Sequence, residues 1–548
     1  MAVWRKTYQA LDSADEYLTR IFDYVTWRDL WLLLLTLAFA VFLAGVTPFA
    51  LVLREDAYNF TVKGMEISLG DFSLDRPQAI GWPLLLGLVF SIMSVDNVFE
   101  AMYVSRWTSI LCTAFGVFAL GKACSAMLTD RSQKGLAVMV VLAYMTNALI
   151  YTMARSAMSE ALFILLVIGV VYFSIRATEA DALDIRSLVT AALLAAASYY
   201  VRPNGLFVFA ALVLTIVLHS WGSRKSTIAA VVVSSAVFVI AISPYLYARF
   251  AAFGSPFDYG PNSKYFVDHY EHVWADNIAA PSLWKFLSTH SIAELYDRFV
   301  DGGLLSVLKH LERWLLNAPG AMIALLGGVT VFLLRKRRAY IVPLVLVVSI
   351  AGISMVYEIF GTVRHLYYLL PLLLLCAAAA FFVLERYRVP VQSIAATAII
   401  LLIASDLPLV VWMGPEQRQI PQVKDHWAVW ASNNIEGTVA IVEGGDFLKM
   451  SQHYEPIGWR VARSFRDVAP HIRVWRPGVY DTLGEAMIHF RKINVRYLIT
   501  DREGLKRRPY LRDVTDPRWQ DQFKHLGYFP VGDRGARLPH VNIYEIIY

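Results

Sequence analysis

Two adjacent carboxylates are the first groups in this sequence that could do chemistry. Glu55 and Asp56 follow directly after the first long apolar run, and Ala57 and Tyr58 come next. Two carboxylates held this close repel each other, so such a pair keeps a proton or pairs with a cation. The structural alternative is a charged helix end that simply meets water.

Basic residues recur at similar places later in the chain. They fall near the ends of apolar runs, in the segments 155–160 (RSAMSE), 200–205 (YVRPNG) and 364–371 (RHLYYLLP). A fixed guanidinium group binds anions through charge-assisted hydrogen bonds. In the alternative interpretation, each arginine only extends its charged tip to the membrane interface.

Apolar helices must position these groups. The chain has 548 residues, of which 57% are hydrophobic and 17% are charged, whereas soluble domains carry about 25% charged residues. A helix needs about 20 apolar residues to cross a bilayer. The sequence therefore predicts a mainly α, polytopic transmembrane bundle of about eleven helices, at 29–53, 102–128, 135–153, 160–175, 187–201, 204–220, 227–248, 318–334, 339–357, 365–384 and 390–412.

Basic loops predict the orientation of these helices. Arg5, Lys6, Arg20 and Arg28 precede the first span, so we expect a cytoplasmic N-terminus. Alternate loops then contain Lys or Arg, most densely at 335–338 (RKRR). This agreement would be lost if the short apolar segment 80–94 crossed the membrane, so we place that segment against the outer interface. The net charge of +6 reflects these loops and does not indicate a nucleic-acid partner.

The predicted layout has two domains. Residues 1–412 form the transmembrane domain, with long outer loops at 54–101 and 249–317, and residues 413–548 form a small soluble α/β domain outside the membrane. In this domain we expect helices at 424–434 and after Thr482, which begins a capping-box pattern. We expect strands at 438–444, 495–500 and 541–547. The three cysteines, Cys112, Cys124 and Cys376, lie in apolar runs and predict no disulfide.

The order of these motifs resembles the GT-C integral membrane glycosyltransferases. In many of them an acidic pair, as in a DDAY string, follows the first transmembrane helix, and a GWP-like entry into an apolar segment comes next. Here the entry is Gly81-Trp82-Pro83, and the first acid is Glu55 where Asp is common. The layout resembles most closely the aminoarabinose transferase and protein O-mannosyltransferase group, over the whole chain.

The resemblance implies a transfer of sugar from a polyprenyl-phosphate donor to an acceptor hydroxyl outside the membrane. A carboxylate takes the acceptor proton in such a reaction. Asp56 is the expected base, and Glu55 is the alternative base or an orienting partner. Groups that stabilise the leaving phosphate are then Arg155, Arg202, Arg364 and His365.

Two further residues are weaker candidates. Tyr58 and Glu160 are expected to contact substrate; Glu160 could also pair with Arg155, or bind a divalent metal together with Asp56. Metal use varies within the class, and no metal-ligand string occurs here, so we expect that no cofactor is required and keep a divalent metal as an alternative. The acceptor is a lipid, a polysaccharide or a protein.

Two other classes of function compete with a transferase. A transporter or lipid flippase usually shows internal repeats and ionisable groups near the middle of its spans, and neither pattern is evident. A non-catalytic scaffold would explain the C-terminal domain but not the acidic pair. The expected location is the plasma (inner) membrane, with many spans and with membrane lipids as partners.

Overall fold

The computed structural model describes most of the helical part of the chain and the strands near its C-terminus. The described residues are 29–46, 55–74, 78–95, 98–128, 134–179, 183–219, 224–257, 264–268, 270–273, 281–315, 318–361, 363–386, 434–441, 472–475, 480–501, 505, 508–530 and 540–548. The predicted span 390–412 and the predicted helix 424–434 lie outside them, apart from Asn434.

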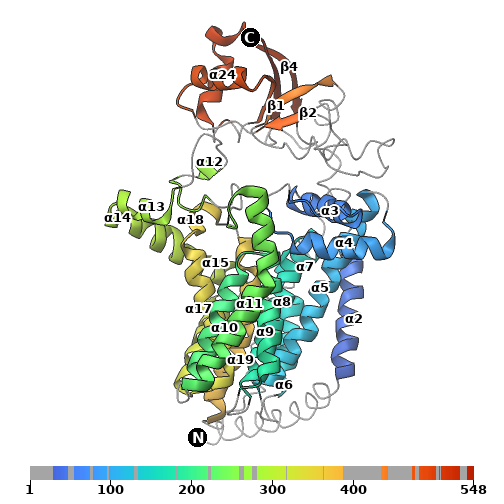
Figure 1. Ribbon diagram of the computed structural model, residues 1–548, viewed down its shortest axis with the longest axis vertical. Coiled ribbons are helices and arrows are strands. Elements are labelled where there is room, and N and C mark those ends of the chain that lie inside the picture. Colours follow the sequence, from blue (N-terminus) through green and yellow to red (C-terminus); the bar gives the residue numbers. More distant parts are fainter. Residues whose placement is uncertain are drawn as a thin grey trace, which may run out of the picture.

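Apolar helices packed side by side form a bundle that makes up most of the molecule (Figure 1). Five helical segments of the described chain are long and apolar enough to cross a membrane singly. They lie in α5 (Val98–Met127), α8 (Glu160–Ala177), α11 (Arg224–Phe253), η5 with α17 (Arg337–Ala339 and Ile341–Ser354) and η6 with α19 (Val363–Leu369 and Leu370–Arg386). Shorter apolar helices complete the bundle and its end: α2 (Asp29–Val46), α4 (Gly81–Met93), α9 (Ile185–Val201), α10 (Gly205–His219) and α16 (Ala318–Leu333).

One predicted span is bent. The segment 135–153 is expected to be a single helix, but α6 (Lys134–Thr146) and α7 (Ala148–Ser156) meet at an angle of 62°. Asn147 causes the break, because its side chain accepts a hydrogen bond from the Leu149 amide and caps α7. Its side-chain amide also donates to the Leu315 carbonyl at 3.0 Å. Helices occupy the other nine predicted spans that fall within the described chain; how many cross a bilayer stays a prediction.

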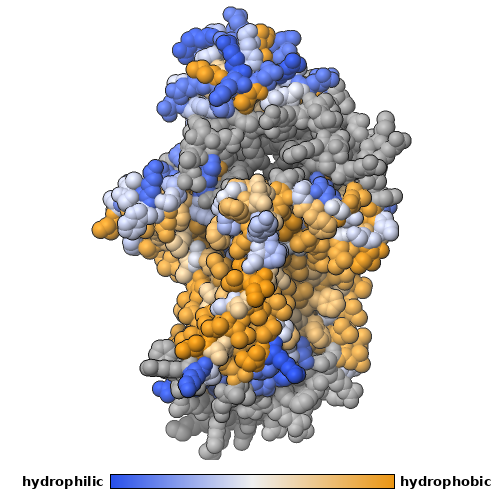
Figure 2. All heavy atoms as spheres, in the orientation of Figure 1, coloured by the Kyte–Doolittle hydropathy of each residue, from blue (hydrophilic) through white to orange (hydrophobic). Residues whose placement is uncertain are grey.

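The surface of the bundle is apolar around its middle. Figure 2 shows an orange band over the helices, with hydrophilic residues concentrated toward the ends. On α11, large apolar side chains such as Ile228, Ile240 and Tyr247 are exposed. Exposed apolar surface of this extent is what a lipid bilayer covers. The chain therefore has the helices and the surface of an integral membrane protein.

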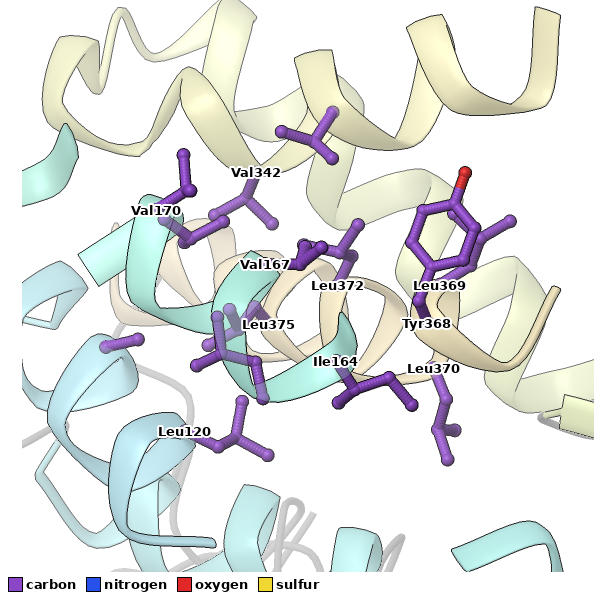
Figure 3. Packing of buried hydrophobic residues seen from close by; sticks show 14 of the residues in the cluster. Leu120, Ile164, Val167, Val170, Val342, Tyr368, Leu369, Leu370, Leu372 and Leu375 are labelled. Atoms are coloured by element: carbon purple, nitrogen blue, oxygen red, sulfur yellow. The ribbon is translucent and has the colours of Figure 1, made fainter. Parts of the chain in front are cut away.

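A large apolar core joins most helices of the bundle. Figure 3 shows Ile164, Val167 and Val170 of α8 facing Leu372 and Leu375 of α19. The backbones of α16 and α19 approach each other closely at Gly327, where a Cβ would lie 1.7 Å from the Cys376 carbonyl oxygen. Tight packing at this interface fixes η6, which directly precedes α19 and carries Arg364 and His365.

Two helices lie across one end of the bundle. Figure 1 shows α3 (Glu55–Ser68) and α4 at this end, turned away from the direction of the bundle helices. Gly64 and Gly87 let them touch, since a Cβ at Gly64 would come within 2.8 Å of Leu86. Helix α4 is the segment that the sequence places at the outer interface; that this end faces outward stays a prediction.

Short helices from the later outer loop also lie at this end (Figure 1). They are α12 (Tyr270–Val273), α13 (Leu283–Thr289), α14 (Ile292–Tyr296), η3 (Asp297–Leu305), α15 (Ser306–His310) and η4 (Leu311–Leu315). Helix α18 (Tyr357–Phe360) packs on η3, and the two are joined by the Arg298–Glu358 ion pair at 3.2 Å.

A five-stranded sheet forms the described C-terminal part of the chain. Its strand order is β2-β1-β3-β5-β4. Strands β1 (Gly437–Ile441), β2 (Ile472–Trp475) and β3 (Val495–Asp501) are parallel, whereas β4 (Phe523–Pro530) and β5 (His540–Ile546) are antiparallel to their neighbours. Helix α24 (Leu483–Lys492) packs on the sheet and is capped by Thr482, as its sequence predicts. A mixed α/β arrangement is thus present; its exposure outside the membrane stays a prediction.

Candidate active site

The acidic residue Asp56 lies in the first turn of α3. The helix begins at Glu55, where negative charge is favoured by the helix dipole. The side chains of Glu55 and Tyr58 lie outside the described part of the structure, and so does that of Arg155, whose backbone belongs to α7. Their proposed roles therefore stay predictions.

Glu160 is the first residue of α8. The chain reverses between α7 and α8 through Ala157, which adopts a left-handed conformation with φ of 51°. This turn brings Met158 and Glu160 to the end of the bundle where α3 and α4 lie. The Glu160 side chain is only 6% exposed.

Arg202 ends α9 at a tight turn. It is the C-cap residue of this helix, and α10 starts again at Gly205. A Cβ at Gly205 would lie 2.4 Å from the Tyr199 amide nitrogen, so the turn requires glycine. Pro203 favours the break, because proline has no amide hydrogen to continue the helix.

Two ion pairs and one further hydrogen bond bring the predicted residues together. Arg364 donates from Nη2 to Oδ2 of Asp56 at 2.7 Å. Arg202 donates from Nη1 to Oε1 of Glu160 at 2.8 Å and from Nη2 to Nδ1 of His365 at 2.9 Å. Five residues from four distant parts of the sequence thus form one cluster, here called the charged cluster.

Helix α4 supports the charged cluster from two sides. The indole nitrogen of Trp82 donates to the Ala157 carbonyl at 3.0 Å, three residues before Glu160. A Cβ at Gly81 would lie 2.7 Å from the backbone of Tyr200 and Val201, directly before Arg202. The GWP motif therefore touches the turn that carries Glu160 and the helix end that carries Arg202. These contacts, and the pairing of Glu160 with Arg202, are not apparent from the sequence.

The charges of the cluster balance, and its two pairs differ in exposure. Two guanidinium groups face two carboxylates. The Asp56 and Arg364 side chains are 31% and 34% exposed, whereas those of Glu160 and Arg202 are 6% and 13% exposed. The more open pair is accessible to a substrate, and the closed pair is positioned to support it.

The Glu160 carboxylate has one unused oxygen. Oε2 of Glu160 is buried and has no hydrogen-bond partner within the described chain. A buried acceptor without a partner is costly, so this oxygen is a candidate contact for a hydroxyl group of a bound molecule.

The described residues do not fit a divalent metal. Among them, no group of three or more histidine, cysteine or acidic side chains could hold a metal ion. Asp56 and Glu160 each use an oxygen on a guanidinium group, and a nearby guanidinium charge opposes a cation. We therefore derive no catalytic step through a metal.

Comparison with known proteins finds similarity at the level of structure. No protein-family model and no curated protein sequence matches the chain. Among solved structures, the archaeal oligosaccharyltransferase AglB from Archaeoglobus fulgidus, in complex with an inhibitory peptide and a dolichol-phosphate, has a TM-score of 0.53 at 13% identity, over 91% of this chain and 73% of that chain. ArnT from Cupriavidus metallidurans bound to undecaprenyl phosphate has a TM-score of 0.51 at 11% identity, over 93% of this chain and 97% of that chain.

A second structure of the Archaeoglobus fulgidus oligosaccharyltransferase, in complex with Zn and sulfate, has a TM-score of 0.54 at 12% identity, over 91% and 72% of the two chains. At such identities the likeness concerns the fold. The structural neighbours are GT-C glycosyltransferases, and this chain has the GT-C fold that its motif order predicts.

Proposed function

We propose that this protein is a glycosyltransferase that moves a sugar from a polyprenyl-phosphate donor to an acceptor hydroxyl on the extracytoplasmic face of the membrane. The observation that carries the proposal is the ion pair at 2.7 Å between Asp56 and Arg364, a partly exposed carboxylate beside a partly exposed guanidinium group. The GT-C fold and the lipid phosphates bound in two of the structural neighbours support it.

Asp56 is the proposed general base. The acceptor oxygen attacks the anomeric carbon of the sugar, and its proton passes to Asp56. The bond between that carbon and the phosphate oxygen breaks, and the electron pair stays on the phosphate. Glu55, the neighbouring acid, is the alternative base or orients Asp56.

Basic groups are proposed to stabilise the leaving phosphate. Negative charge develops on it as the bond breaks, and fixed donors aimed at that position lower the barrier. Arg364 and His365 are adjacent in η6, and Arg202 touches His365. Arg155 is proposed for the same role from the end of α7. Tyr58 and the unused oxygen of Glu160 are proposed contacts for sugar or acceptor hydroxyls.

The transporter or flippase alternative is less well supported. The residues of the charged cluster on α3, α8 and α9 lie at helix ends, in the first turn of α3, the start of α8 and the end of α9. A transport site is expected near the middle of the spans. The plasma (inner) membrane, a cytoplasmic N-terminus and an outer C-terminal domain remain part of the proposal.

The test is release of sugar from a panel of radiolabelled polyprenyl-phosphate sugars by the purified chain in lipid nanodiscs. Each donor is offered with and without a mixture of lipid, polysaccharide and peptide acceptors. We expect one donor to be consumed, with polyprenyl phosphate formed in equal amount. Movement of intact donor between the leaflets of vesicles, without any cleavage, would support the flippase instead.

A further inference from the structure

The two described arginines of the charged cluster have different partners. Arg202 uses Nη1 on Glu160 and Nη2 on His365, and its side chain is 13% exposed. Arg364 uses Nη2 on Asp56, and its Nη1 lies 3.9 Å from the Met158 sulfur, a weak acceptor. Arg364 is therefore the more open of the two and has donor capacity left for a ligand.

The contact with Arg202 determines which nitrogen of His365 carries the proton. A guanidinium group has only donors, so Nδ1 of His365 must accept the hydrogen bond at 2.9 Å. A doubly protonated ring would place one N–H against another and is excluded by the same contact. The imidazole is therefore neutral with its proton on Nε2, and the hydrogen bonds of His365 in the described chain leave this N–H without an acceptor.

We propose that Arg202 is a positioning residue that fixes His365 as the Nε2–H tautomer, and that this N–H donates to the phosphate of the donor beside Arg364. This assignment rests on the proposed function, in which Arg202 and His365 both stabilise the phosphate, and it gives the two residues different roles. Arg202 acts through His365, whereas His365 and Arg364 touch the phosphate. Glu160 completes the arrangement by holding the other arm of Arg202.

Charge balance favours a neutral donor at this position. Asp56 and Glu160 already neutralise the guanidinium groups of Arg364 and Arg202. A neutral N–H adds a directed hydrogen bond to the phosphate without adding a third positive charge to a partly buried site. Fixing the tautomer in advance also removes the cost of reorienting the ring when the donor binds.

Two amide substitutions distinguish the roles of the two ring nitrogens of His365. His365→Gln places an amide N–H₂ near the position of Nε2 and removes the partner of Arg202. His365→Asn places its amide near Nδ1 and leaves nothing at Nε2. The measurement is the affinity of the full-length purified chain for undecaprenyl phosphate in detergent micelles, with thermal unfolding of each variant as the control for folding.

We expect His365→Gln to keep the wild-type affinity within about threefold and His365→Asn to lose about tenfold or more, the effect of one hydrogen bond to a charged group. Equal losses, or a larger loss for the glutamine variant, would overturn the assignment of Nε2–H. This contrast leaves the ion pair of Arg202 and Glu160 in place, so it does not depend on a variant that risks misfolding.

A double-mutant cycle tests the role of Arg202. Arg202→Ala should weaken binding when His365 is present and should add little in the His365→Gln background, because its effect passes through the imidazole. Additive losses would show direct contact between Arg202 and phosphate and would overturn this inference alone. A wild-type chain that binds no undecaprenyl phosphate would contradict the proposed function as well.

Discussion

The partners Asp56 and Arg364 are 308 positions apart in the sequence and form the most open ion pair of the charged cluster. Glu160 and Arg202 form the closed one. We propose different roles for the two pairs: Asp56 and Arg364 contact the substrates, and Arg202, held by Glu160, positions His365.

The low exposure of the Glu160–Arg202 ion pair leads to a prediction about the stability of the protein. Glu160→Ala leaves Arg202, whose side chain is 13% exposed, without its carboxylate, and removing one partner of a buried pair costs about 3–5 kcal/mol. We expect a marked fall of the melting temperature in nanodiscs, and a smaller one for Glu160→Gln, which keeps an acceptor oxygen. The matched control is Glu179→Ala, which breaks the exposed pair with Arg176 and should change stability by less than about 1 kcal/mol. Equal shifts for both alanine variants would refute the structural role of Glu160.

The partners of the two carboxylates lead to a prediction about the metal dependence of turnover. Both described carboxylates of the site face guanidinium groups, and no third ligand accompanies them in the described residues. We expect turnover to be unchanged after dialysis against EDTA and after addition of Mg²⁺ or Mn²⁺. A loss on chelation that one of these metals restores would return Asp56 and Glu160 to the role of metal ligands.

Among the helices, α4 connects the two segments that carry Arg202 and Glu160. Its first two residues touch the end of α9 and the turn before α8. The sequence predicts the apolar segment and the GWP entry, because both are local patterns. It does not show what Gly81 and Trp82 touch, because those contacts join segments more than 70 residues apart.

Gly81→Ala tests this link. The added Cβ would meet backbone atoms of Tyr200 and Val201 at 2.7 Å, and backbone cannot move aside as a side chain tip does. We expect a displaced Arg202, a loss of stability of about 1–3 kcal/mol and a clear fall in turnover. Gly45→Ala in α2 is the control, since a Cβ there has open space. Wild-type turnover and melting temperature for the Gly81 variant would show that α4 does not position the site.

The positions of the helices could be predicted, and their breaks only in part. Apolar length predicts the bundle helices α5, α8 to α11, α16, α17 and α19 within a few residues. The bend at Asn147 escapes such a pattern, because one side chain causes it by capping α7 and by holding the distant Leu315 carbonyl. The pairing of Glu160 with Arg202 escapes it too, because the two residues come from different helices and Arg155 is the basic residue nearer to Glu160 in the sequence.

At the scale of the whole molecule, the orientation in the membrane depends on the basic loops. Single cysteines report it well, because Cys112, Cys124 and Cys376 are buried. We expect Ile488→Cys, an exposed position on α24, to react with a membrane-impermeant maleimide on intact cells. Arg337→Cys, in an exposed basic turn, should react only after permeabilisation. The reverse pattern would invert the predicted topology and place the charged cluster on the cytoplasmic side.

The turnover of Asp56→Asn tests the proposed role of Asp56 most directly. The substitution keeps the shape of the side chain and an oxygen for Arg364 but removes the base, so we expect sugar transfer to fall by about 10²–10⁴-fold while undecaprenyl phosphate still binds. Asp71→Asn is the matched control, because Ser73 lowers the pKa of Asp71 through hydrogen bonds and keeps it charged beyond the end of α3. It should transfer sugar at about the wild-type rate. An Asp56→Asn variant as active as the Asp71→Asn control would contradict the assignment of Asp56 as the catalytic base.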